Sequence, residues 1–173
     1  TILVRYASIV LEPVQAEMTR PSTNRQPVYV PSICNENELY YPGDQKDDWI
    51  CDCRPAYLYH PKSDACWPAW RQGPCNISEY LTLPNNTVIP TCELNPCKRD
   101  GIAIYKGLCW NLGATAPCIH LYPTPAALGV NATSLAVECV PLKLDNRFGE
   151  NYDFVPINIS HCPAGSKRCV KPH

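Results

Sequence analysis

The sequence predicts a small disulfide-rich fold, mainly β, made of short hairpins with long irregular loops and little helix. Three observations predict it: twelve of the 173 residues are cysteine, nineteen are proline, and only eight are glycine. Proline breaks helices and avoids the interior of sheets, and the prolines here are spread from Pro13 to Pro172. Only the segment from Ala126 to Val137 has room for a short helix, and Gly129 weakens it.

The cysteines indicate an oxidising compartment, where disulfides persist. No Cys-x-x-Cys pair is present, and the spacing of Cys51-Asp-Cys53 is too tight for a standard zinc knuckle. We therefore expect all twelve cysteines to form disulfides, with no metal and no required cofactor. A chain of short strands and irregular loops buries only a modest hydrophobic core, so the disulfides must supply much of the stability. Each disulfide typically contributes about 2 to 4 kcal/mol.

Hairpin-like segments suggest how the cysteines pair. The turn-rich stretches 40–44 and 60–64 each lie between two cysteines that can close a hairpin. The nine-residue step from Cys66 to Cys75 recurs from Cys109 to Cys118, and a Trp follows the first cysteine both times. This pattern predicts two copies of one module and sequential pairing, although sequence alone does not choose a connectivity. The expected pairs are Cys34–Cys51, Cys53–Cys66, Cys75–Cys92, Cys97–Cys109, Cys118–Cys139 and Cys162–Cys169.

We expect the chain to divide into four parts. They are an N-terminal strand with a Pro-rich arm (1–33), a first Cys-rich module (34–92), a second (93–139), and a tail with a small disulfide loop (140–173). The apolar segment 1–11 alternates in part, as a strand does. It either pairs with the body of its own molecule or exchanges with a neighbour, which would give a homo-oligomer.

Asn-x-Ser/Thr sequons indicate N-glycosylation of a secreted protein. We expect at least two of the four to carry sugar. The four are Asn76, Asn85, Asn131 and Asn158.

Two families share cysteine motifs with the chain. The stretch Cys51-Asp-Cys53-Arg-Pro-Ala-Tyr57 through Cys66 resembles the tail of an EGF-like or trypsin-inhibitor-like module, with Ala56 in place of the usual Gly. Residues 34–139, with Gln72-Gly-Pro-Cys75 followed by Glu79-Tyr-Leu-Thr-Leu83, resemble a repeated Cys-rich domain of secreted arthropod (insect) proteins that has no assigned function. The second resemblance implies an extracellular arthropod protein and implies no activity.

Motifs for catalysis are missing from the sequence. It contains no His-Glu-x-x-His and no Gly-x-Ser-x-Gly, so we expect no enzyme. The net charge of −1 and the lack of a basic stripe argue against nucleic acid, and no apolar run of about 20 residues could span a membrane. Four acidic residues could bind Ca²⁺, but a solvated loop face is the simpler interpretation: Asp44, Asp47, Asp48 and Asp52.

Aromatic residues are the remaining candidates for binding. Trp67 and Trp110 suit burial against a cystine, and Trp67-Pro-Ala-Trp70 could instead line a pocket for a ligand. The candidate ligand-binding residues are Trp67, Trp70, Trp110, Tyr59 and Tyr105.

Three functions remain open. The first is a non-enzymatic secreted glycoprotein that binds extracellular proteins or has a structural role in an extracellular fluid or matrix. The second is a carrier of a small apolar ligand, such as a pigment or lipid, in an aromatic-lined pocket or a subunit interface. The third is a serine protease inhibitor, for which Lys98-Arg99 is the candidate reactive site.

Overall fold

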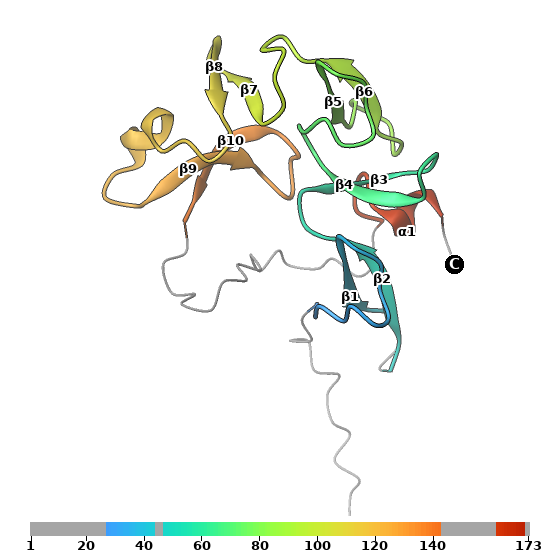
Figure 1. Cartoon of the computed structure of the whole chain (residues 1–173). Coiled ribbons are helices and arrows are strands. Elements are labelled where there is room, and N and C mark those ends of the chain that lie inside the picture. Colours follow the sequence, from blue (N-terminus) through green and yellow to red (C-terminus); the bar gives the residue numbers. More distant parts are fainter. Residues whose placement is uncertain (1–26, 44–46, 143–161, 172–173) are drawn as a thin grey trace, which may run out of the picture.

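The computed structural model describes residues 27–43, 47–142 and 162–171. Within these ranges the chain forms five antiparallel two-stranded hairpins in sequence order (Figure 1). The elements are β1 (Glu38–Pro42), β2 (Trp49–Cys53), β3 (Tyr57–His60), β4 (Ala65–Pro68), β5 (Glu79–Thr82), β6 (Thr91–Leu94), β7 (Ile102–Tyr105), β8 (Leu108–Asn111), the 3-10 helix η1 (Ala116–Leu121), β9 (Ala126–Val130), β10 (Val137–Pro141) and α1 (Lys167–Val170). The expectation of a small, mainly β, disulfide-rich fold is confirmed.

Each hairpin carries one disulfide in the same place. A cysteine upstream of the first strand bonds to a cysteine on the second strand, as Cys75 bonds to Cys92 opposite Leu81. The Cα atoms of the five hairpin pairs lie 5.4 to 5.8 Å apart, a normal separation for a cystine. No cysteine is free, and the pairing is the sequential one: Cys34–Cys51, Cys53–Cys66, Cys75–Cys92, Cys97–Cys109, Cys118–Cys139, and Cys162–Cys169 in the C-terminal loop.

The segment 126–137 is not a helix, so that expectation was wrong. It forms β9 and the turn that leads into β10. The side chain of Asn131 accepts hydrogen bonds from the backbone N–H groups of Thr133 and Ser134, a local turn that competes with helix formation. The β-branched residues Val130 and Val137 then pair across the hairpin, where such side chains pack well.

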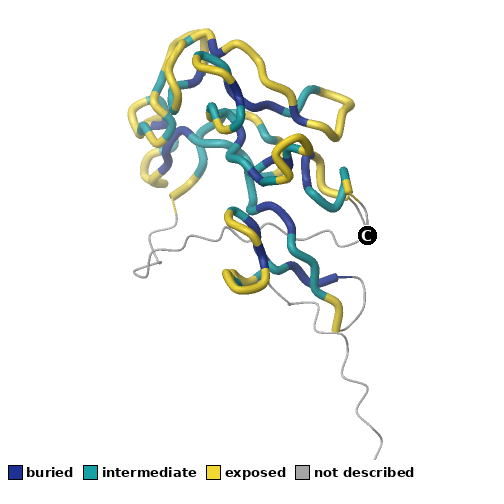
Figure 2. Tube along the Cα trace, turned by 45° about the vertical axis from the view of Figure 1, so that its right-hand side comes forward, coloured by how far each residue is buried: buried dark blue, intermediate teal, exposed yellow. Residues whose placement is uncertain are grey.

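The described residues form three small hydrophobic clusters rather than one core, and Figure 2 shows the buried residues spread along the chain in short dark-blue stretches. The first contains Leu58 and Leu81, the second contains the Cys53–Cys66 disulfide, and the third lies around Cys118 and Leu128. Each cluster is too small to hold a domain by burial alone, so the disulfides carry much of the stability.

The C-terminal segment returns to the start of the described chain. Helix α1 contacts β2 and β3 (Figure 1), although β10 precedes it in sequence. None of the helices in the described ranges is long and apolar enough to cross a membrane.

Candidate functional site

The most elaborate polar site lies where the C-terminal loop meets the first hairpin. We call it the C-terminal clasp: Glu38 on β1 and Asp52 on β2, with Lys167 and Arg168 on α1. Both carboxylates are about 1% exposed. A buried carboxylate is costly unless it is paired and hydrogen-bonded, so the partners of each one decide what the site does.

Asp52 binds the beginning of α1 through main chain and side chain together. Its Oδ1 accepts from the backbone N–H of Cys53 and of Lys167, both at 2.7 Å. Its Oδ2 accepts from the Arg168 guanidinium and, at 3.4 Å, from the Arg168 backbone N–H. Both carboxylate oxygens of Asp52 therefore accept hydrogen bonds from residues of α1.

Glu38 is paired in the same way. Its Oε1 lies 2.8 Å from the Lys167 ammonium, and its Oε2 accepts from the backbone N–H of Asn35 at 3.2 Å. The Asn35 contact recurs in the third hairpin, where Glu79 accepts from the backbone N–H of Asn76 at 3.0 Å. The motif Cys-Asn-x-x-Glu at 34–38 and 75–79 therefore builds one local turn twice, and only Glu38 adds an ion pair with α1.

Tyr41 covers the clasp from the side of β1. Its hydroxyl donates to the carbonyl of Cys53 at 2.6 Å, and the Arg168 guanidinium carbon lies 5.1 Å from its ring centroid, within range of a cation–π contact. Burial, and then the negative charge of Asp52, raise the pKa of Tyr41 far above its usual value. The ring therefore stays neutral and acts as a hydrogen-bond donor.

Gly165 lets the C-terminal loop approach β3. The Gly165 carbonyl accepts from the backbone N–H of Tyr59 at 2.8 Å. A Cβ at Gly165 would lie 2.4 Å from Cδ2 of Leu58, and its φ of +74° is a left-handed conformation that glycine adopts readily. Val170 packs against the cluster of Cys53, Tyr59 and Cys66, so apolar contact and ion pairs act at the same interface.

The predicted ligand-binding aromatics lie in three different clusters. Trp67 and Trp70 pack on the first, Tyr59 is part of the second, and Tyr105 and Trp110 pack on the third. Trp67 and Trp110 each pack on a cluster that contains a disulfide-bonded cysteine. This agrees with the expectation that they pack against a cystine, not with the alternative that they line a ligand pocket. The five residues are not brought together into one site.

Three of the five residues also donate hydrogen bonds through their side chains. Trp70 Nε1 donates to the Leu135 carbonyl at 2.7 Å, and Trp67 Nε1 donates to Ser63 Oγ at 2.9 Å. The Tyr59 hydroxyl donates to Asp64, and this bond raises the pKa of Tyr59 to about 12. The Trp70 bond joins segments 65 residues apart in sequence, whereas the Trp67 and Tyr59 bonds lie within the β3–β4 hairpin.

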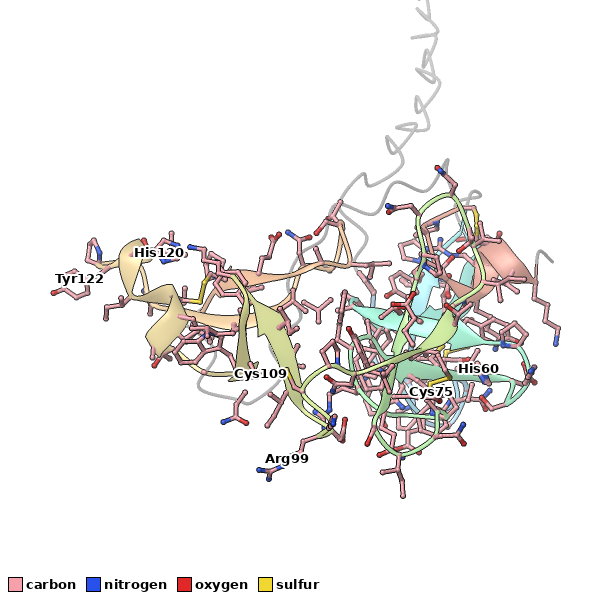
Figure 3. All side chains as sticks on the ribbon, turned by 90° about the horizontal axis from the view of Figure 1, so that it is seen from above. His60, Cys75, Arg99, Cys109, His120 and Tyr122 are labelled. Atoms are coloured by element: carbon pink, nitrogen blue, oxygen red, sulfur yellow. A yellow bond between two sulfur atoms is a disulfide. The ribbon has the colours of Figure 1, made fainter. Side chains whose placement is uncertain are left out.

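The loop that carries Lys98-Arg99 is exposed and internally braced. Asn95 is 2% exposed; its Nδ2 donates to the carbonyls of Arg99 and Ile102, each at 3.0 Å, and its Oδ1 accepts from the backbone N–H of Cys97. Arg99 points away from the body of the protein (Figure 3). The loop is thus held in one shape from within.

A bidentate ion pair joins this loop to the segment between β4 and β5. The Arg71 guanidinium reaches both carboxylate oxygens of Asp100, at 3.0 and 3.1 Å. Arg71 is the main reason that the pKa of Asp100 lies below its usual range. Both side chains are about 40% exposed or more, so the pair fixes geometry more than it adds stability.

The four acidic residues, for which a solvated loop face was the simpler interpretation, are not found in one environment. Asp52 is buried in the clasp, Asp47 and Asp48 are exposed, and Asp44 lies outside the described residues. A solvated loop face is therefore wrong for Asp52. Carboxylates also lie near sulfur at Cys34, Glu38 and Cys51 and at Cys75, Glu79 and Cys92, but these cysteines are in disulfides and offer no thiolate to a metal.

Three of the four sequons lie in the described part of the chain. Asn76 and Asn85 are exposed and Asn131 is half-buried, while Asn158 and the N-terminal segment 1–11 lie outside the described residues. Sequence reasoning missed the clasp. Two signals for it were present, the repeated Cys-Asn-x-x-Glu motif and the basic pair Lys167-Arg168 within the last cysteine loop.

Comparison with known proteins identifies one family. A family model described as Domain of unknown function (DUF4789) matches residues 29–170. No curated protein and no solved structure matches the chain. The match spans all five hairpins and the clasp, so these features lie within the region that defines the family.

Proposed function

We propose that this chain, which belongs to the DUF4789 family of domains of unknown function, is a secreted, N-glycosylated and non-enzymatic protein that binds other molecules or has a structural role outside the cell. An arthropod extracellular fluid or matrix is the setting that its resemblance to secreted arthropod domains favours. The proposal depends on how the cysteines and the buried charges are used.

The cysteines supply the observation that carries the proposal. All twelve are consumed in six disulfides, five of which close a hairpin. Such a framework forms and persists in the secretory pathway, whereas cytosolic thiols are kept reduced. An architecture of small clusters tied by cystines is typical of extracellular modules.

Buried ionisable groups support the non-enzymatic part. Catalytic sites usually rely on ionisable groups in buried positions, and the described residues include Glu38, Asp52 and Tyr41 as buried ionisable groups. Each of them is bonded to another part of the same chain. They join segments, which is a structural use of buried charge.

Expression with a signal peptide in an insect cell line tests the proposal. The expected product is secreted, carries sugar, and reacts with an alkylating reagent at its twelve cysteines only after reduction and unfolding. Retention in the cell, or free thiols in the secreted and unfolded protein, would contradict it. Native mass spectrometry of the same sample tests the ligand-carrier alternative, because a bound pigment or lipid adds mass that denaturation removes.

A serine protease inhibitor is the second candidate, because the Lys98-Arg99 loop is exposed and braced by Asn95. One feature counts against it. Lys98 has a φ of +57°, and the Ile102 N–H bonds back to the Arg99 carbonyl, whereas extended peptides bind by adding a strand. Inhibition of a trypsin-like protease by the wild type that is lost in Arg99→Ala would support this function, and equal residual protease activity with both would remove it.

A further inference from the structure

The β5–β6 hairpin exposes more apolar side chain than its neighbours. Ile77 is 84% exposed and Leu94 is 70% exposed, at the end of the hairpin where β5 begins. Val88 and Ile89, in the loop at the other end, are 42% and 50% exposed. All four residues of β6 are exposed as well.

These side chains form two patches. Ile77 and Leu94 make the first patch, since the backbone bond between Ser78 and Asn95 at 2.8 Å holds their two segments side by side. Val88 and Ile89 make the second patch, beside the Thr87 hydroxyl, which donates to the carbonyl of Ile89. Exposed apolar groups on an open strand edge favour unwanted association.

A sequon lies at each patch. Asn76 is the residue directly before Ile77, and Asn85 lies in the same loop as Val88 and Ile89. Both asparagines are exposed. Within the described residues neither side-chain amide takes part in a hydrogen bond, so each nitrogen is available for a sugar at no cost to the fold.

Asn131 differs in each of these respects. It is half-buried, its Nδ2 donates to Glu138 on the next strand, and its Oδ1 accepts from the backbone N–H groups of Thr133 and Ser134. A sugar on this nitrogen would have to fit beside β10, and no exposed large apolar side chain of the described residues is adjacent to Asn131 in sequence.

We propose that Asn76 and Asn85 are the glycosylated sequons among the three that are described, that Asn131 is largely unmodified, and that the two N-linked sugars cover the two apolar patches. N-linked sugar is bulky and solubilising, so it turns an aggregation-prone hairpin into a soluble surface. This inference rests on the proposed secretion, and it adds which sites are used and what the sugars do.

The experiment uses the full chain secreted from a glycosylating eukaryotic cell. Peptide mass spectrometry after enzymatic deglycosylation in heavy-oxygen water marks each modified asparagine. We expect marks at Asn76 and Asn85 and little at Asn131. The matched control is Thr133→Ala, which removes the Asn131 sequon without changing the Asn131 side chain; its intact mass should change only by the substitution.

The covering role is tested on the double variant Asn76→Gln/Asn85→Gln. We expect loss of the monomer peak in size-exclusion chromatography and increased binding of a hydrophobic dye, with unchanged circular dichroism. Adding Ile77→Ser and Ile89→Ser should restore the monomer, because the patches themselves are then polar. If the double variant is not secreted, native removal of sugar from the folded wild type gives the same comparison.

Two results would overturn the inference: a sugar-free protein that stays monomeric with unchanged dye binding, or as much sugar on Asn131 as on Asn76 and Asn85. Both leave the proposed function standing, because the protein is still a secreted glycoprotein. A wild type that is retained in the cell, or that carries no sugar at any sequon, would instead refute the proposed function.

Discussion

Replacing Lys167 with Met isolates the energetic role of the clasp. Lys167→Met keeps the length and packing of the side chain but removes the ammonium that lies 2.8 Å from Glu38. Glu38 is 1% exposed, and within the described part of the chain its only remaining hydrogen-bond donor would be the Asn35 backbone N–H. Breaking a buried pair in this way typically costs about 3 to 5 kcal/mol, because an uncompensated charge is left behind.

We therefore expect Lys167→Met to lose about 3 to 5 kcal/mol of stability at pH 7, because the carboxylate of Glu38 stays buried without its charged partner.

Lys171 provides a matched control of the same residue type. Its ammonium lies 3.9 Å from Asp64, with side-chain exposures of 62% and 64%. Exposed pairs contribute about 0 to 1 kcal/mol, so Lys171→Met should change little. The two variants remove the same charge from the same segment, and they differ mainly in the burial of the partner.

Native-state hydrogen exchange is the appropriate assay, because the disulfides allow the clasp to open without global unfolding. The Tyr59 amide, which donates to the Gly165 carbonyl, reports on opening of the C-terminal loop. A loss of about 3 kcal/mol corresponds to exchange at least about a hundredfold faster in Lys167→Met. Equal exchange rates in Lys167→Met and Lys171→Met would refute the claim that the buried pair holds the loop.

Three further predictions follow from other contacts. Gly165→Ala should loosen the C-terminal loop by about 1 to 3 kcal/mol, since its Cβ would meet Leu58 at 2.4 Å; hydrogen exchange of the loop measures this. Tyr59 has its pKa raised to about 12 by Asp64, so folding favours its protonated form, and stability should fall as the pH rises from about 10 to about 12; Tyr59→Phe should lessen this decline in denaturant titrations, and the remainder comes from Tyr41 and Tyr80, whose pKa values are also raised. Asn95→Ala should leave backbone groups unpaired at a cost of about 1 to 3 kcal/mol and should speed tryptic cleavage in its loop, which gel electrophoresis follows.

The local structure was readable from the sequence because the cysteine spacing encodes it. A hairpin needs a turn between two short strands, and stretches such as 60–64 supply turn residues between paired cysteines. Sequential pairing follows when each disulfide closes the hairpin that brings its cysteines together. The exception was 126–137, where the apolar pattern fits both a helix and a strand. The side chain of Asn131 favours the hairpin because it stabilises a turn between the two strands.

The sequence carried signals for single members of the clasp, but their pairing could not be derived because it is a contact over a long sequence distance. The Asp52–Arg168 pair joins residues separated by 116 positions, and no periodicity or motif around either residue indicates which residue it pairs with. Asp52 stood among other acidic residues, so its charge suggested a solvated loop or a cation site. Only the fold shows that β2 turns this carboxylate inward while Asp47 and Asp48 stay exposed.

Disulfides and polar side-chain contacts stabilise different levels of this structure. Disulfides span 7 to 21 residues, so each restricts a short loop and stabilises one hairpin or loop locally. Only Cys53–Cys66 joins two hairpins, because Cys53 is on β2 and Cys66 is on β4. The other parts of the chain are joined by side chains: Trp70 bonds to the Leu135 carbonyl, Arg71 to Asp100, and the clasp joins the C-terminal loop to β1 and β2. Reduction should therefore unfold the hairpins, whereas charge and polar substitutions should change how the hairpins are arranged relative to one another.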